Sequence, residues 1–106
     1  PTNRNLKGFR LFGNEYNETT WKGMLLQVVK LVMERYTDIV DTLYDAEGFF
    51  WSAKQADTIY CTMIAPQKYL WTSMDNRSKL RCLRFLFEKC DIAESELVML
   101  LEPVKE

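Results

Sequence analysis

The sequence predicts an α+β domain in which a small antiparallel or mixed sheet packs on helices. Segments rich in β-branched and aromatic residues alternate with segments whose apolar residues recur every three or four positions. Turn-forming residues separate these segments. The predicted order is a hairpin, two helices, two strands, a helix and a final strand, which is typical of an α+β fold.

The hairpin comes first. Residues 8–12 are β-prone, Gly13-Asn14 is a two-residue turn signal, and residues 15–18 form the predicted returning strand. The polar, non-periodic residues 1–7 are expected to be a linker.

Two helices are predicted to follow, over residues 20–36 and 37–46. Thr19 or Thr20 is the expected N-cap of the first helix, which has one broad apolar face. Thr37 is the expected cap of the second, shorter helix. The longer helix is therefore the expected organiser of the core.

The second half of the chain is predicted to hold three strands and one helix. The expected strands lie near residues 58–64, 68–72 and 97–101, and Ala65-Pro66 separates the first two. Asp75 or Asn76 is the expected N-cap of a helix over residues 77–90, whose leucines recur on one face.

Length and composition fit one globular domain, over residues 8–103, which we expect to be part of a longer protein. The chain has 106 residues, of which 47% are hydrophobic and 27% charged. Its longest apolar runs are only a few residues, far short of the ~20 that span a bilayer. Three cysteines without CxxC spacing are expected to be reduced and packed as small hydrophobes. We therefore expect a soluble, cytoplasmic protein without a membrane association.

Catalysis is not expected. The chain contains no histidine, so it lacks the commonest general base and every Ser-His or Cys-His pair. Its four glycines are isolated and form no phosphate-binding loop. The thiols alone cannot complete a four-ligand zinc site. We expect no enzyme activity, no cofactor and no metal.

Charge is sorted into blocks along the chain. Residues 1–36 carry a net charge of +3, residues 37–66 of −4, residues 67–90 of +4 and residues 91–106 of −4. The formal net charge of −1 therefore hides a patterned surface. Such a surface favours a protein partner, the remainder of a parent chain or a second copy, with basic blocks facing acidic ones.

The first candidate site is the aromatic cluster of Phe49, Phe50 and Trp51. Three consecutive aromatic side chains cannot all point inward, and exposed aromatic side chains are enriched at interfaces. The alternative is an irregular loop folded over the edge of the core. The leading hypothesis is a non-catalytic accessory or protein-interaction domain that uses these residues.

The second candidate site is the basic face of the 77–90 helix, which suits phosphate groups and hence nucleic acid. Aromatic residues just before the helix make base stacking conceivable. The alternative is a solvated face, or one that pairs with the acidic segments. The residues of this candidate site are Arg77, Lys79, Arg81, Arg84, Tyr69 and Trp71.

The hairpin entering a Trp-led helix, and the Tyr-x-Trp-Thr strand before a Leu-rich helix, resemble small accessory domains of bacterial and phage nucleic-acid enzymes. The resemblance is one of pattern, without a diagnostic motif, and it assigns no role to any residue.

Overall fold

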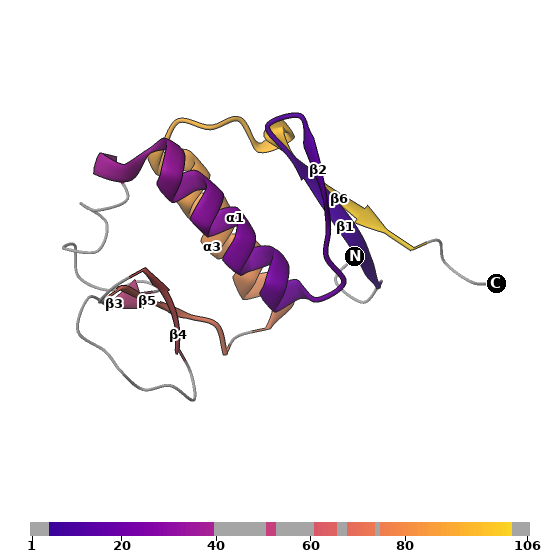
Figure 1. Ribbon diagram of the computed structural model, residues 1–106, viewed down its shortest axis with the longest axis horizontal. Helices are drawn as coiled ribbons and strands as arrows, with labels where there is room; N and C mark the ends of the chain where they lie inside the picture. Colours follow the sequence, from indigo (N-terminus) through magenta and orange to yellow (C-terminus); the bar gives the residue numbers. More distant parts are fainter. Residues whose placement is uncertain (1–4, 40–50, 53–60, 66–67, 74, 103–106) are drawn as a thin grey trace.

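The fold is α+β, as predicted. A computed structural model describes residues 5–39, 51–52, 61–65, 68–73 and 75–102. Two long helices lie side by side, and strands flank the pair on two sides (Figure 1). The elements are β1 (Leu6–Leu11), β2 (Asn14–Asn17), α1 (Trp21–Arg35), β3 (Trp51–Ser52), β4 (Cys61–Ala65), β5 (Lys68–Trp71), α3 (Asn76–Lys89), the 3-10 helix η1 (Glu94–Glu96) and β6 (Leu97–Leu101).

The strands form two separate sheets, whereas the sequence predicted one. The first sheet has the order β2-β1-β6 and the second the order β3-β5-β4, and all pairs are antiparallel. In the first sheet, Leu97 lies opposite Leu11 and Met99 opposite Phe9, which places these apolar side chains on the core side. The pairing of strands depends on contacts between residues far apart in the sequence. The order of predicted strands therefore did not show that they divide into two sheets.

Both long helices begin at predicted caps. The Thr20 side chain accepts a hydrogen bond from the backbone N–H of Gly23 at 3.0 Å, and Asp75 accepts one from that of Ser78 at 2.7 Å. These bonds satisfy donors that the first helical turn leaves open. Residues 37–39 are helical, in agreement with the start of the predicted 37–46 helix, and its remainder lies outside the described residues.

The hairpin turn lies one residue earlier than predicted, at Phe12-Gly13. Both residues have positive φ angles, 52° and 82°, as a type I′ turn requires. In this register Phe9 lies opposite Tyr16, and their rings stack at 5.0 Å. Arg10 lies opposite Glu15 with 3.3 Å between Nη2 and Oε1. A Gly13-Asn14 turn would shift the pairing and separate both pairs, so cross-strand contacts decide the register.

The first strand begins at Leu6, two residues before the predicted hairpin. Leu6 is 2% exposed and belongs to the core. A bulge between Leu6 and Gly8 lets the strand stay paired with β6. A β-carbon on Gly8 would collide with the carbonyl oxygen of Tyr16, so the close approach of β1 and β2 requires glycine here.

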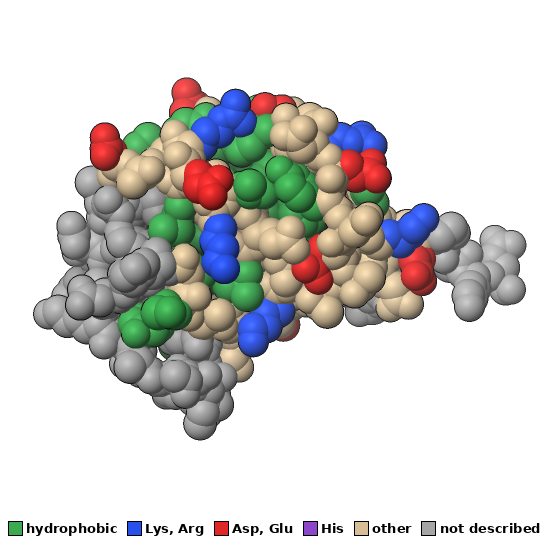
Figure 2. Space-filling model, viewed as in Figure 1, with side chains coloured by type: hydrophobic (Ala, Val, Ile, Leu, Met, Phe, Trp, Pro, Cys, Tyr) green, Lys and Arg blue, Asp and Glu red, His purple; other side chains and the backbone are tan. Residues whose placement is uncertain are grey.

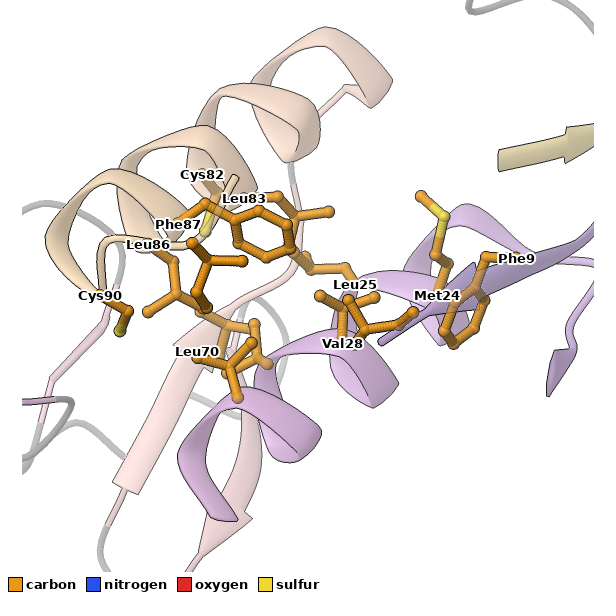
Figure 3. Close-up of a cluster of buried hydrophobic side chains, with 14 of the residues drawn as sticks. Phe9, Met24, Leu25, Val28, Leu70, Cys82, Leu83, Leu86, Phe87 and Cys90 are labelled. Carbon is orange, nitrogen blue, oxygen red and sulfur yellow. The ribbon is translucent and has the colours of Figure 1, made fainter. Parts of the chain in front are cut away.

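The core runs between the two helices and reaches both sheets (Figure 3). Leu25 and Val28 of α1 point toward Leu83 and Phe87 of α3. Leu70 of β5 closes the core toward the second sheet, while Phe9 of β1 and Met24 lie toward the first. The helix pair is therefore the central layer to which both sheets are attached.

A candidate protein-interaction groove

The strand β6 has an open edge within the described part of the chain. It pairs with β1 on one side, and no described strand pairs with its other side. The backbone N–H of Phe12 donates to the carbonyl oxygen of Glu96 at 3.3 Å, and that of Glu102 donates to Asn5 at 2.9 Å. Hydrogen-bonded pairs alternate along an antiparallel ladder, so Val98 and Leu100 bond toward β1. The backbone groups of Met99 consequently point to the open edge.

An unpaired edge of this composition is unusual. All five residues of β6 are apolar, and none is a charged residue or a proline that would blunt an edge. Val98, on the face away from the core, is 41% exposed. Such an edge offers a template for pairing with another chain.

A groove of about 250 Å³ lies between this strand and α3. Apolar side chains of α3 form one wall of the groove, and apolar side chains of β6 form the other. The groove therefore lies beside the unpaired edge of β6. Its lining residues are Leu80, Leu83, Arg84, Phe87, Glu94, Leu97 and Met99.

Charged side chains mark the rim of the groove. The guanidinium Nε of Arg84 lies 3.1 Å from a carboxylate oxygen of Glu94, and both side chains are 72% exposed. An ion pair this exposed contributes little to stability, since water screens it. Arg77 and Arg81 are exposed on the same side of α3. The groove therefore has an apolar lining with one charged pair at its rim, and two further exposed arginines lie on the same helix.

The structure separates the six residues of the predicted basic site. Arg77, Arg81 and Arg84 form the exposed stripe on α3, but Lys79 is only 7% exposed. Burial lowers the pKa of Lys79, and nearby Asp75 opposes that shift. Lys79 therefore does not belong to the exposed stripe.

The aromatic residues of that predicted site lie in the other sheet. Tyr69 and Trp71 belong to β5, where Tyr69 is half-buried and Trp71 is 49% exposed. The indole N–H of Trp71 donates to the carbonyl oxygen of Ser73 at 3.0 Å. Of the predicted partner-binding cluster, Trp51 lies in β3 opposite Leu70, and Phe49 and Phe50 lie outside the described residues.

The face seen in Figure 2 carries mixed charge. Apolar side chains gather over α1 and toward the hairpin, and single Lys/Arg and Asp/Glu side chains are scattered around them. The charge blocks of the sequence therefore do not form a patch of one sign on this face. The exposed arginines of α3 are a separate basic feature of the described residues.

Cys82 and Cys90 are free thiols buried in the core. Burial raises the pKa of the Cys82 thiol to about 12, and it also raises that of Cys90. A buried neutral thiol is a poor nucleophile and a poor metal ligand. Within the described ranges, no three His, Cys, Asp or Glu residues gather as a metal site requires. Nor is any described helix both long and apolar enough to span a bilayer.

Sequence reasoning did not find the groove, although one signal was present. A strand with one face toward solvent normally alternates apolar and polar residues. The Leu-Val-Met-Leu-Leu run of β6 is apolar throughout. A strand without this alternation is typical of one that is covered on both faces, so the apolar run of β6 indicates that a further protein segment packs against it.

Comparisons with protein-family models, with curated proteins and with solved structures gave no match. The geometry of the groove and its chemistry therefore carry the functional conclusions.

Proposed function

We propose that this chain is a non-catalytic protein-interaction domain that binds a polypeptide partner in the groove between α3 and β6. One observation carries the proposal: a wholly apolar strand, with one edge that no described strand covers, borders an apolar groove. Interfaces of this kind combine an apolar floor with a polar rim. The exposed Arg84–Glu94 pair supplies such a rim.

The chemistry of the chain supports binding over catalysis. Histidine is absent from the sequence, and burial favours the neutral form of the Cys82 and Cys90 thiols. The groove itself holds one arginine and one glutamate, which pair with each other. An ion pair at an apolar groove is suited to orienting a ligand.

The proposal is tested by selecting binders from a random peptide library displayed on phage. We expect peptides that bind the parent chain to lose binding to Leu80→Glu, because a carboxylate then enters the groove. The matched control is Met63→Glu, which adds the same charge at an exposed apolar position of β4 in the other sheet and should retain binding. Failure to enrich any binder, or equal binding to both variants, would count against a binding site in this groove.

The predicted aromatic site is tested in the same selection. Trp51→Ala removes the one member of the cluster that lies in a described strand. Loss of binding to Trp51→Ala, with binding to Leu80→Glu unchanged, would move the partner site from the groove to residues 49–51.

Nucleic-acid binding by α3 is the second candidate function. The observation that favours it is the exposure of Arg77, Arg81 and Arg84 on one side of the helix. It predicts that labelled oligonucleotides bind with an affinity that falls steeply between roughly 50 and 200 mM salt. Binding should vanish on combining Arg81→Glu with Arg84→Glu. Absence of binding at the lower salt concentration would eliminate this function.

A further inference from the structure

We infer that the partner is an extended segment that adds to β6 as a fourth, antiparallel strand, with apolar residues facing α3 and acidic residues at its ends. This inference rests on the proposed function and names the chemistry of the ligand. It joins two features: the edge of β6 with which no described strand pairs, and the exposed arginines of α3, of which Arg84 lines the groove.

The backbone geometry favours a strand over a helix as the occupant. Met99 presents both its N–H and its carbonyl oxygen to the open edge, because Val98 and Leu100 on either side bond toward β1. An added strand can form hydrogen bonds with both backbone groups of Met99, whereas the backbone of a bound helix cannot, because its own groups bond within the helix. The neighbouring Leu97 N–H already bonds to the carbonyl oxygen of Glu94, so pairing is expected to centre on Met99.

The side-chain pattern of the ligand follows from the same register. Residues that lie directly opposite in an antiparallel pair point to the same face of the sheet. Met99 and Leu97 line the groove, so the ligand residues opposite them also face the groove. There they meet Leu80, Leu83 and Phe87, which calls for apolar side chains at alternate positions.

The basic excess of α3 favours acidic residues at the ends of the segment, and Glu94 is the one acidic residue among those that line the groove. The helix α3 carries five basic residues and one acidic residue. Its exposed arginines are Arg77, Arg81 and Arg84, and the first and last are seven positions, or about 10 Å of helix, apart. A groove-facing carboxylate can bind Arg84, which lines the groove, through two parallel hydrogen bonds to its guanidinium. The other exposed arginines of α3 attract acidic residues over a longer range.

The same charge argues against a second copy as the occupant. In Figure 1, α3 rises toward the loop from which β6 descends, so the helix and the strand run in opposite directions. Two copies joined along β6 would be related by a two-fold axis beside that strand. The axis would bring two α3 helices together, each with an excess of basic residues.

The inference is tested with the fluorescein-labelled heptapeptide Glu-Thr-Leu-Thr-Val-Thr-Glu and the full chain, by fluorescence anisotropy. The two Glu, the Leu and the Val share the face expected to lie toward the groove. We expect saturable binding that weakens on going from roughly 50 to 200 mM salt. The matched peptide with Lys in place of both Glu should bind at least about tenfold more weakly.

Backbone methylation of the probe distinguishes a strand from any other bound form. Methylating the amide nitrogens of its Leu and Val removes the donors that face β6, and should weaken binding about tenfold or more. Methylating two of the Thr nitrogens, which point to solvent, should leave binding nearly unchanged. Equal effects of the two methylation patterns, or equal binding of the Lys peptide, would overturn the inference.

Two further outcomes separate this inference from the proposed function. If no probe binds but the phage selection yields Leu80-dependent peptides of another pattern, the groove is an interaction site and the acidic-strand inference is wrong. Sedimentation of the chain without peptide tests the other occupant. A dimer that Leu80→Glu dissociates would also overturn the inference, in favour of a second copy.

Discussion

The carboxylate of Glu18 occupies the space that a β-carbon on Gly23 would fill. From there it accepts hydrogen bonds from the backbone N–H of Thr20 at 3.0 Å and from its hydroxyl at 2.9 Å. The side-chain amide of Gln27 donates to its other oxygen at 2.6 Å. In a capping box, the third helical residue supplies the carboxylate that binds the N-cap N–H. Here the carboxylate comes from Glu18, two residues before the N-cap Thr20. Gly23, the third helical residue, has no β-carbon and so leaves space for this carboxylate.

Replacing Gly23 with alanine should therefore destabilise the fold. In most helices this change stabilises by up to about 1 kcal/mol. Here the added methyl group displaces the Glu18 carboxylate from its three donors, and we expect a loss of about 1 kcal/mol or more. Urea unfolding monitored by circular dichroism measures the difference. In a Glu18→Ala background the space is empty, so the same Gly23→Ala change should become stabilising; a loss in both backgrounds would contradict the account.

The Glu18 network should also make stability depend on pH. The hydrogen bond from the Thr20 N–H, followed by the side-chain bonds, lowers the pKa of Glu18 below its ordinary value of 4.5. A lowered pKa stabilises the fold above the unfolded-state value, and this contribution is lost as pH falls through the folded value. The stability difference between the parent chain and Glu18→Gln should thus shrink below about pH 4.5. Asp75, whose pKa is also lowered, remains in both proteins. A difference that is constant down to pH 3 would argue against this role.

Phe12 and Arg35 should be energetically coupled. Phe12 has a positive φ, a costly conformation for a bulky residue, and the Arg35 guanidinium carbon lies 4.0 Å from its ring centroid. A cation–π contact at an exposed site is worth about 0.5–1 kcal/mol. A double-mutant cycle of Phe12→Leu and Arg35→Gln, measured by unfolding, should return a coupling energy of that size. A coupling energy near zero would mean that the ring is held by packing alone.

The buried thiols should react slowly. In a Cys61→Ser chain, only Cys82 and Cys90 remain, and they are 0% and 4% exposed. We expect a colorimetric disulfide reagent at pH 8 to modify neither within minutes, because reaction requires local or global unfolding. Both should react at once in guanidinium. Fast modification of either thiol in the native chain would show that α3 opens readily.

Features of the fold that depend on neighbouring residues were predicted correctly more often than features that depend on contacts between distant residues. Thr20 and Asp75 mark the helix starts correctly because capping depends only on neighbouring residues. The turn at Phe12-Gly13 escaped prediction because contacts across the hairpin, such as the Phe9–Tyr16 stack, outweigh the local preference of Gly13-Asn14.

The candidate site was harder to predict than the helices. Arg84 was expected on an exposed basic face and lies there, but its neighbour across the groove, Glu94, could not be read from helix periodicity. The groove exists because β6 pairs with β1 and leaves its other edge beside α3. That arrangement depends on pairing between segments more than eighty residues apart. The hypothesis for Phe49 and Phe50 lies outside the described residues and stays a prediction.

Hydrogen exchange of the β6 amides, measured by NMR, tests the open edge most directly. In the free chain we predict slow exchange at Val98 and Leu100, which bond toward β1, and fast exchange at Met99 between them. Adding the acidic heptapeptide should slow the exchange of Met99 and leave its two neighbours unchanged. A Met99 amide as protected as its neighbours in the free chain would show that another segment already covers this edge, and would contradict the proposed interaction site.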